Sequence, residues 1–399
     1  MLINLRNAMM AGKRLPYDAE VEYLESTGTQ WIDTGVSISN ASLADVTWNV
    51  EAVSYNDGCM GAYGIRPYAS MYFNLYKNKF YMRNMRTEGG SFTGVSGFNT
   101  VRFSGGNSYL NGTAVETEIP LNINPVRTMY LFAYNRSETM PGFCKARVSS
   151  FIVKENGVLL CDFIPVRKGT VGYLYDRVSG KLFGNAGTGD FVLGPDVVPV
   201  EYIESHGTEW IDTGLVWDSL KWECVADITA TRKIDENYII SQYGSGQGAV
   251  YAFVYMHQNE ARLAYNRNAA AKYVVNNQFF GTKHTWHAIY ESGAQRLDIG
   301  DNIHLSASQQ YVAGLTEEGM RIILGGMQTF GGKATGIRFG NVMIAHVSTS
   351  VRSFRPVRVG TGSTWEGAMM DTLTRRIYRN AGTGAFTYGN DLKYPIPAE

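Results

Sequence analysis

The sequence predicts an all-β protein built from two tandem antiparallel β-sandwich domains. One observation is an internal repeat: residues 21–36 (VEYLESTGTQWIDTGV) and 200–215 (VEYIESHGTEWIDTGL) are identical at twelve of sixteen positions, without a gap. The other is composition, because 44 Gly, 25 Tyr and only 18% charged residues suit many short strands joined by tight turns. A hydrophobic content of 44% argues against disorder.

A second pair of matching segments closes each copy of the repeat. Residues 185–194 (NAGTGDFVLG) and 380–389 (NAGTGAFTYG) match at an offset of 195 residues, whereas the opening segments match at an offset of 179. The second copy therefore carries a net insertion of sixteen residues. Each copy is long enough to bury a core of its own. We expect an N-terminal arm at residues 1–20, a first sandwich at 21–195 and a second at 196–399.

The N-terminal arm lies outside the repeat, and its first ten residues fit a short helix. One interpretation is a frayed leader. The other is a docking segment that inserts into a partner through its apolar residues Leu2, Leu5, Met9 and Met10. Charged residues interrupt the apolar ones, so we predict no signal peptide and synthesis in the cytoplasm. No run of about 18 apolar residues occurs, so we expect no membrane insertion.

Strands and hairpins are predicted from residue 21 onward. Val46, Trp48 and Val50 alternate with polar residues, as in a half-buried strand. Residues 71–83 fit two strands around a turn at residues 77–79. Residues 101–115 fit three strands, separated by Gly-Gly and Asn-Gly dipeptides that favour the positive φ angles of type I′ turns.

The second copy repeats this plan. Residues 286–299 fit a hairpin around Ser292-Gly293, and residues 145–152 match residues 336–343. The repeated segments stand at the start and end of each copy. In a sandwich whose first and last strands are neighbours, such segments close the sheet and hide its edges. We therefore expect a sandwich or jelly roll in each copy.

The opening string EYLESTGTQWIDTG, residues 22–35, resembles the start of laminin-G-like, concanavalin A-like jelly rolls in phage and prophage proteins of gut bacteria. Residues 151–189 are similar to the closing half of that family, which has a strand, a turn such as Glu155-Asn156-Gly157, a second strand, a Phe-x-Pro element and Tyr175-Asp176. The second copy has Met370 in place of the Tyr and lacks the Asn-Gly turn. The resemblance covers roughly residues 21–390 and implies tandem lectin-like jelly rolls and, by analogy, glycan or partner binding.

Carboxylates in a pattern for glycoside hydrolysis are missing from the sequence. That chemistry needs an acid and a base or nucleophile about 5–10 Å apart. Glu22, Glu25 and Asp33 recur in the second copy, but their spacing does not place them on one strand face. We expect the two glutamates to be solvated on an outer strand and Asp33 to cap the turn at Gly35. We predict no enzyme, and a glycoside hydrolase is the lowest-ranked alternative.

Metal and cofactor signals are also sparse. All six histidines lie in the second copy, and the spacing of His284 and His287 splits them across two strand faces. The Gly-Thr-Gly segments lack the Gly-Lys-Ser/Thr ending of a phosphate loop, so we expect tight turns there. By the family resemblance, Asp176 and Asp371 are weak candidates for calcium, but each copy offers one carboxylate to an ion that takes six to eight oxygens. We expect no cofactor, with calcium as the alternative.

Four cysteines and many aromatic residues complete the candidates. No cysteine has a counterpart in the other copy and no CxxC occurs, so we expect reduced structural thiols. Exposed aromatic rings can stack on sugars. The candidates for such a surface are Tyr72, Tyr76, Tyr81, Trp222 and Trp286, although about half of the rings in such a set pack in a core.

The charge balance limits the partners. Lys+Arg and Asp+Glu number 36 each, so no long-range field favours nucleic acid. The reading we favour is a non-enzymatic structural or appendage protein of a phage virion, which docks on other virion proteins through residues 1–20 and displays two lectin-like domains as a homo-oligomer. The alternative is a carbohydrate-binding adhesin of a gut bacterium or prophage.

Overall fold

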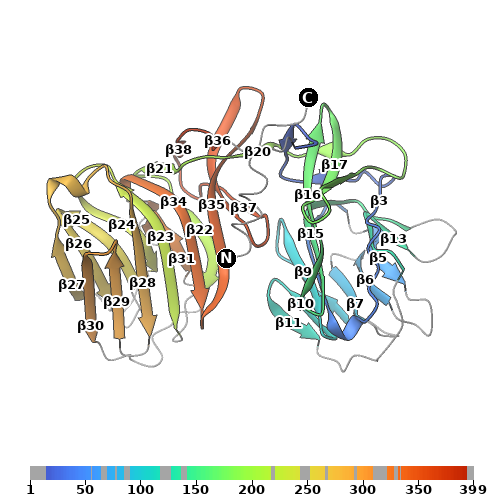
Figure 1. Cartoon of the computed structure of the whole chain (residues 1–399), viewed down its shortest axis with the longest axis horizontal. Helices are drawn as coiled ribbons and strands as arrows, with labels where there is room; N and C mark the ends of the chain where they lie inside the picture. The colour runs from blue at the N-terminus through green and yellow to red at the C-terminus, as the bar shows by residue number, and fades with distance from the viewer. Residues whose placement is uncertain are drawn as a thin grey trace. The chain divides into compact units, whose positions relative to one another are not determined.

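A computed structural model of the chain shows two all-β units, each a pair of mostly antiparallel sheets (Figure 1). It describes residues 15–54, 56–63, 70–76, 79–84, 90–116, 127–135, 142–216, 221–242, 252–265, 268–291, 294–308, 321–327, 331–332 and 334–392. Among these, the first compact unit contains residues 15–197 and 374–376, and the second contains 198–373 and 377–392. The all-β class and the tandem sandwich architecture predicted from the sequence are confirmed.

The larger sheet of the first unit runs in the order β11 (Thr113–Glu116), β10 (Asn107–Leu110), β9 (Asn99–Ser104), β4 (Ala44–Ala52), β15 (Ala146–Glu155), β16 (Val158–Lys168), β17 (Val171–Asp176) and β18 (Lys181–Phe183). The short strands β1 (Ala19–Glu20), β2 (Leu24–Glu25) and β19 (Val192–Leu193) join it. The smaller sheet runs β14 (Gly142–Phe143), β13 (Ala133–Asn135), β5 (Asn56–Tyr63), β6 (Ser70–Tyr76), β7 (Lys79–Asn84) and β8 (Gly90–Phe92), with β12 (Tyr130–Leu131) and β3 (Ile32–Asp33) attached.

The second unit repeats this arrangement. Its larger sheet runs β30 (Ile303–Ser308), β29 (Ala294–Ile299), β28 (His284–Glu291), β23 (Trp222–Ala230), β34 (Thr335–His346), β35 (Thr349–Thr361), β36 (Thr364–Asp371) and β37 (Ile377–Tyr378), joined by β20 (Asp196–Pro199), β21 (Ile203–His206) and β38 (Thr387–Tyr388). Its smaller sheet runs β22 (Ile211–Val216), β31 (Arg321–Leu324), β24 (Ile234–Gln242), β25 (Ala252–Gln258), β26 (Glu260–Tyr265) and β27 (Asn268–Val274). A two-stranded pair, β32 (Gly326–Met327) and β33 (Gly331–Gly332), and two short 3₁₀ turns, Ala41–Leu43 and Asn277–Phe279, complete the described elements.

The first and last strands of each copy are neighbours, as predicted. Leu24 of β2 lies opposite Leu193 of β19, and Ile203 of β21 lies opposite Tyr388 of β38. The Gly105-Gly106 and Asn111-Gly112 turns both have positive φ at their two central residues, which is the type I′ requirement. Residues 77–78 and 292–293, the other two predicted turns, lie outside the described residues, but the strands on either side of them pair as hairpins.

Each unit buries a core of its own between its sheets. The first core contains Trp48, Phe73 and Phe151, and the second contains Trp286, Phe339 and Phe354. In the first unit a smaller cluster forms where Leu15 and Tyr17 cover Ile164 and Val166. Residues 15–20, which we expected in the arm, therefore pack as part of the first sandwich, and β1 pairs with β16. Cys144, Cys161 and Cys224 are buried thiols, as predicted.

Candidate functional site

The residues that are identical in the two copies close the sandwich. The Oδ1 atom of Asn185 accepts hydrogen bonds from the backbone N–H of Trp31 at 3.1 Å and of Gly187 at 2.8 Å, and Asn380 makes the same two bonds to Trp210 and Gly382. A Cβ on Gly187 would lie 2.0 Å from a backbone oxygen, so only glycine fits. The Asn-Ala-Gly-Thr-Gly loops are therefore structural turns, as the sequence analysis expected.

An arginine ties the opening strand of each copy to the larger sheet. Arg147 contacts Glu25 at 2.6 Å and lies 4.7 Å from the Tyr23 ring centroid, and Arg338 makes the corresponding contacts with its own glutamate and tyrosine. Glu25 is thus engaged in an ion pair, and Glu22 is only 8% exposed. The expectation that both glutamates are solvated on an outer strand is wrong, because Glu25 lies in β2 between β15 and β19, and the backbone of Glu22 is bonded to Pro195 of the closing segment.

Asp33 caps its turn as predicted. Its Oδ1 atom accepts a hydrogen bond from the N–H of Gly35 at 2.9 Å, and Asp212 binds Gly214 at the same distance. These short caps hold the positive φ of both glycines. The recurring carboxylate is therefore part of the turn in each copy.

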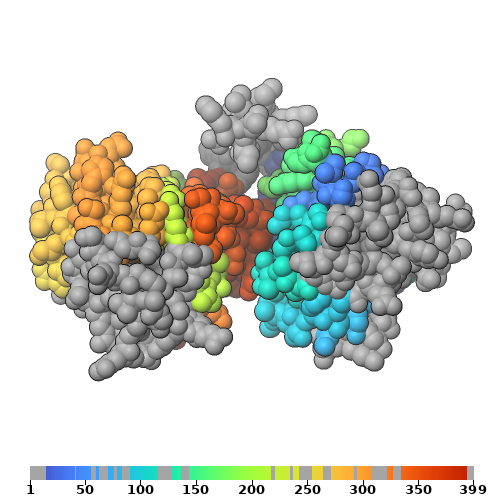
Figure 2. All heavy atoms as spheres, turned by 90° about the horizontal axis from the view of Figure 1, so that it is seen from below, coloured from blue at the N-terminus to red at the C-terminus, as the bar shows by residue number. Residues whose placement is uncertain are grey.

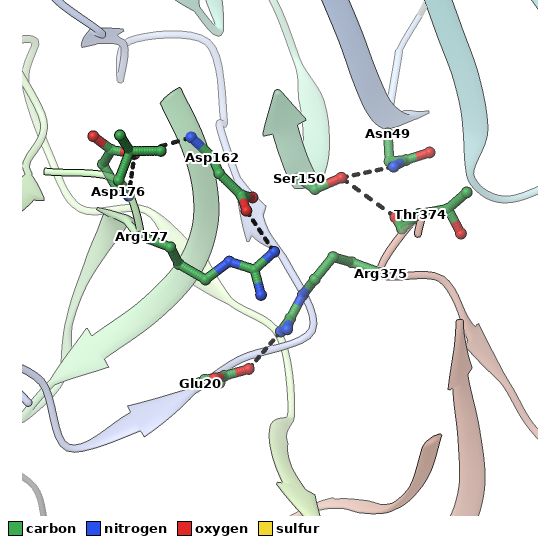
Figure 3. Close-up of polar contacts among 9 residues, drawn as sticks. Glu20, Asn49, Ser150, Asp162, Asp176, Arg177, Thr374 and Arg375 are labelled. Carbon is green, nitrogen blue, oxygen red and sulfur yellow. Dashed lines mark hydrogen bonds and ion pairs between the residues drawn. The ribbon is translucent and has the colours of Figure 1, made fainter. Parts of the chain in front are cut away.

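The two weak calcium candidates also cap turns. Asp176 accepts hydrogen bonds from the N–H groups of Asp162, Val178 and Ser179 at 2.9–3.1 Å, as Figure 3 shows for Asp162. Asp371 accepts hydrogen bonds from two backbone N–H groups, those of Ser353 and Leu373. A carboxylate surrounded by amide donors has little capacity left for a cation.

The histidines do not gather into a metal site. His287 contacts Glu223 at 2.6 Å and His304 contacts Asp298 at 2.7 Å, while His284 stacks on Phe279 with 4.3 Å between ring centroids. His284 and His287 thus point to different faces of β28, as their spacing predicts. Across the described ranges, no three His, Cys, Asp or Glu side chains lie close enough together to hold a metal ion.

The two candidate tryptophans are core residues. Trp222 is 4% exposed and Trp286 is 1% exposed. Both side chains point between the sheets of the second unit, so neither indole offers a face to a sugar. Strand alternation places each tryptophan on one face of its strand, but without a known register the sequence did not show which face is covered.

Two of the candidate tyrosines, Tyr72 and Tyr81, lie on the outer face of the smaller sheet of the first unit. Tyr72 and Tyr81 are half-buried, whereas their neighbours Phe73, Phe80 and Met82 are fully buried. The ring of Tyr72 lies 4.7 Å from that of Tyr134, above Gly61, where a Cβ would meet a backbone oxygen at 2.3 Å. Nothing is described of the Tyr76 side chain, although its backbone ends β6.

Sequence reasoning missed part of this tyrosine face. Tyr130 lies opposite Asp33 at the rim of the same sheet, and its ring is 4.4 Å from that of Trp31. Trp31 recurs as Trp210 in the second copy, a recurrence that indicates a packing residue. Tyr130 and Tyr134 lie on short strands separated by Phe132, whose φ of 61° interrupts the alternation that would have shown them on one face.

The docking residues Leu2, Leu5, Met9 and Met10 lie outside the described residues. In the ranges that the structure describes, no helix has the length and hydropathy needed to cross a membrane.

Comparisons with known proteins add a distant likeness in architecture. No protein-family model matches the chain, and no curated protein matches it significantly. Among solved structures, domains LG4-5 of the mouse laminin alpha1 chain match at 11% identity, over 86% of this chain and 94% of that chain, with a TM-score of 0.29. The LG1-3 region of the laminin alpha2 chain matches at 9% identity, over 90% of each chain, with a TM-score of 0.28. The tandem sandwich assignment itself rests on the sheet order and registers given above.

Proposed function

We propose that this chain is a non-enzymatic structural or appendage protein of a phage particle, and that its two lectin-like sandwiches are displayed for attachment or protein–protein contact. One observation carries the proposal: the residues shared by the two copies build turns and closures, while the outward strands between them differ. Asn185, Arg147, Asp33 and Asp176 all have structural counterparts in the second copy. A scaffold that is kept while its surfaces change suits binding and display.

The contacts of the recurring carboxylates support the non-enzymatic part of this proposal. Glu25 pairs with an arginine, and Asp33 and Asp176 accept hydrogen bonds from backbone amides. A glycoside hydrolase needs an acid and a second carboxylate that face a common space. The glycoside hydrolase therefore stays the lowest-ranked alternative. The proposed function needs no cofactor.

The particle assignment rests on the resemblance of residues 22–35 and 151–189 to phage and prophage jelly rolls. Its test is mass spectrometry of purified particles from the source culture, which should detect this chain in proportion to the other virion proteins. Deleting residues 1–14 should abolish incorporation while both sandwiches stay folded, because the variant keeps every described residue of the first sandwich, including Leu15 and Tyr17. Particles that lack the chain would sink the proposal, and normal incorporation of the deletion variant would sink the docking arm.

A carbohydrate-binding adhesin is the second candidate, and the tyrosine face favours it. Tyr72 and Tyr81 present half-buried rings on neighbouring strands, an arrangement that can stack on pyranose rings. A glycan array with the full chain tests this function, and Tyr72→Ala with Tyr81→Ala should lose the signal. Tyr273→Ala is the matched control, because that tyrosine is 43% exposed on the second unit. If the full chain binds no glycan, or if the control variant loses binding as strongly as the Tyr72 and Tyr81 variant, only the display function is left.

A further inference from the structure

In the second unit, the two strands that end the sheets at one side are long. β27 is the last strand of the smaller sheet and has seven residues, and β30 is the last strand of the larger sheet and has six. The two strands lie side by side (Figure 1). Within the described residues, the corresponding last strands of the first unit, β8 and β11, have three and four residues. A long edge strand offers a row of backbone N–H and C=O groups to another strand, and short edges are one way proteins avoid this.

The C-terminal part of β27 is open to solvent. Tyr273 and Val274, at its end, are 43% and 60% exposed. In the space-filling view of Figure 2, the yellow and orange atoms of this part of the chain lie at the left side of the unit. The outward edge of β27 has no strand partner among the described residues.

We propose that the outer edge of β27 pairs with the same edge of a second copy of this chain, antiparallel about a two-fold axis. A two-fold axis that runs between the two edge strands, perpendicular to them, makes the strands antiparallel and the interface self-complementary. The smaller sheets of the two copies would join into one continuous sheet. Because β30 lies beside β27, its edge faces the partner as well and extends the contact to the second layer.

The charges of the strand fit a self-pairing. The sequence of β27, NAAAKYV, holds no proline and a single charge, Lys272, whereas edges that are protected against pairing carry proline or several charges. A two-fold axis at the middle residue, Ala271, places Lys272 opposite residue 270 of the partner, which is alanine, and so opposes no like charges. Lys272 is held in its own subunit by Glu260 at 3.0 Å. An unrelated partner would need an unpaired edge strand of its own, whereas a second copy of this chain already has one.

The inference does not depend on the phage assignment, and its test is made on the full chain alone. Sedimentation velocity at increasing protein concentration should show a monomer–dimer equilibrium. Hydrogen exchange should slow with concentration at the amides of residues 268–274, and the amides of β8 in the first unit should not change. Val274→Lys places a charge at the end of the edge and should weaken the dimer by about tenfold or more. Val192→Lys, at a valine 46% exposed on the first unit, is the matched control and should leave it unchanged.

A chain that stays monomeric at all concentrations would overturn the proposal. A dimer whose exchange protection falls elsewhere, or one that resists Val274→Lys, would overturn it as well. Circular dichroism of both lysine variants shows that each is folded, so a lost dimer reports the interface.

Discussion

At the scale of single residues, one difference between the copies concerns the turn after the opening strand. In the first copy the neutral Gln30 side chain accepts from the N–H of Thr27 at 2.8 Å, and in the second copy Glu209 accepts from the N–H of His206 at 2.7 Å. Burial alone would raise the pKa of the Glu209 carboxyl, but hydrogen bonds from His206 and Thr208 outweigh it and lower that pKa below its ordinary value. The same turn is thus pH-dependent in one copy only.

Glu209→Gln should remove this dependence. Because the folded-state pKa is lowered, the ionised carboxylate stabilises the second unit above its unfolded-state pKa, and this contribution is lost as the pH falls through the folded value. The variant should lose about 1 kcal/mol at pH 7 and less at pH 3. Urea unfolding at the two pH values measures this difference. The mirror variant Gln30→Glu should gain a pH dependence in the first unit; a variant whose loss of stability is equal at both pH values would contradict the argument.

The core tryptophans form a second residue-scale difference. In the larger sheet of the first unit, Trp48 of β4 lies opposite Val101 of β9. At the same place in the second unit, Ala226 of β23 lies opposite Trp286 of β28. The large indole has moved to the neighbouring strand while a small residue took its former place, which keeps the volume of the core layer.

Exchanging the pair in the second unit should therefore be tolerated far better than either single change. Trp286→Val leaves a cavity and should cost about 3–5 kcal/mol, and Ala226→Trp alone overpacks the layer. The double variant, which copies the first unit, should recover at least half of the summed loss. Chemical denaturation of the two singles and the double gives the coupling energy. Losses that simply add would show that the layer does not act as one unit.

At the scale of elements, turn chemistry explains most of what the sequence predicted. Asn111-Gly112 and Asn156-Gly157 take positive φ at both residues, so the dipeptides alone located these hairpins. The turn between β34 and β35 could not be recognised in this way. Val347 and Ser348 occupy it with φ of 46° and 63°, and a β-branched residue pays a steric penalty there. Tertiary pairing of the flanking strands holds the turn against its local preference.

Replacing this turn with that of the first copy should stabilise the second unit. Val347→Asn with Ser348→Gly puts residues that favour left-handed backbone at both positions, and should gain about 1–2 kcal/mol. Val347 is 54% exposed, so little packing is lost. Thermal unfolding followed by circular dichroism measures the gain. The reverse change in the first copy, Asn156→Val with Gly157→Ser, should destabilise by a similar amount; a gain there instead would contradict the strain argument.

At the scale of the whole molecule, the repeat predicted the architecture well and the functional surfaces poorly. Matching segments at the two ends of each copy showed that the first and last strands are neighbours, because both hold the same closure contacts. The candidate surfaces depended on which face of each strand is covered. Trp222 and Tyr72 follow similar alternating patterns, yet Trp222 faces the core and Tyr72 faces outward. A shift of one residue in register reverses every face, and local sequence does not fix register.

Two separate cores imply two separable unfolding transitions. The buried clusters of the first and second units share no residue. Trp286→Val should therefore lower the melting temperature of the second unit by roughly ten degrees or more and leave the transition of the first in place. Phe132→Gly should lower the melting temperature of the first unit and leave the transition of the second in place. Phe132 is fully buried against Phe191 in the first unit, so losing its ring outweighs the relief of its positive φ, which its counterpart Gly325 adopts without penalty. Differential scanning calorimetry of the full chain resolves the two transitions, and a single transition that moves as a whole in both variants would show that the units unfold together.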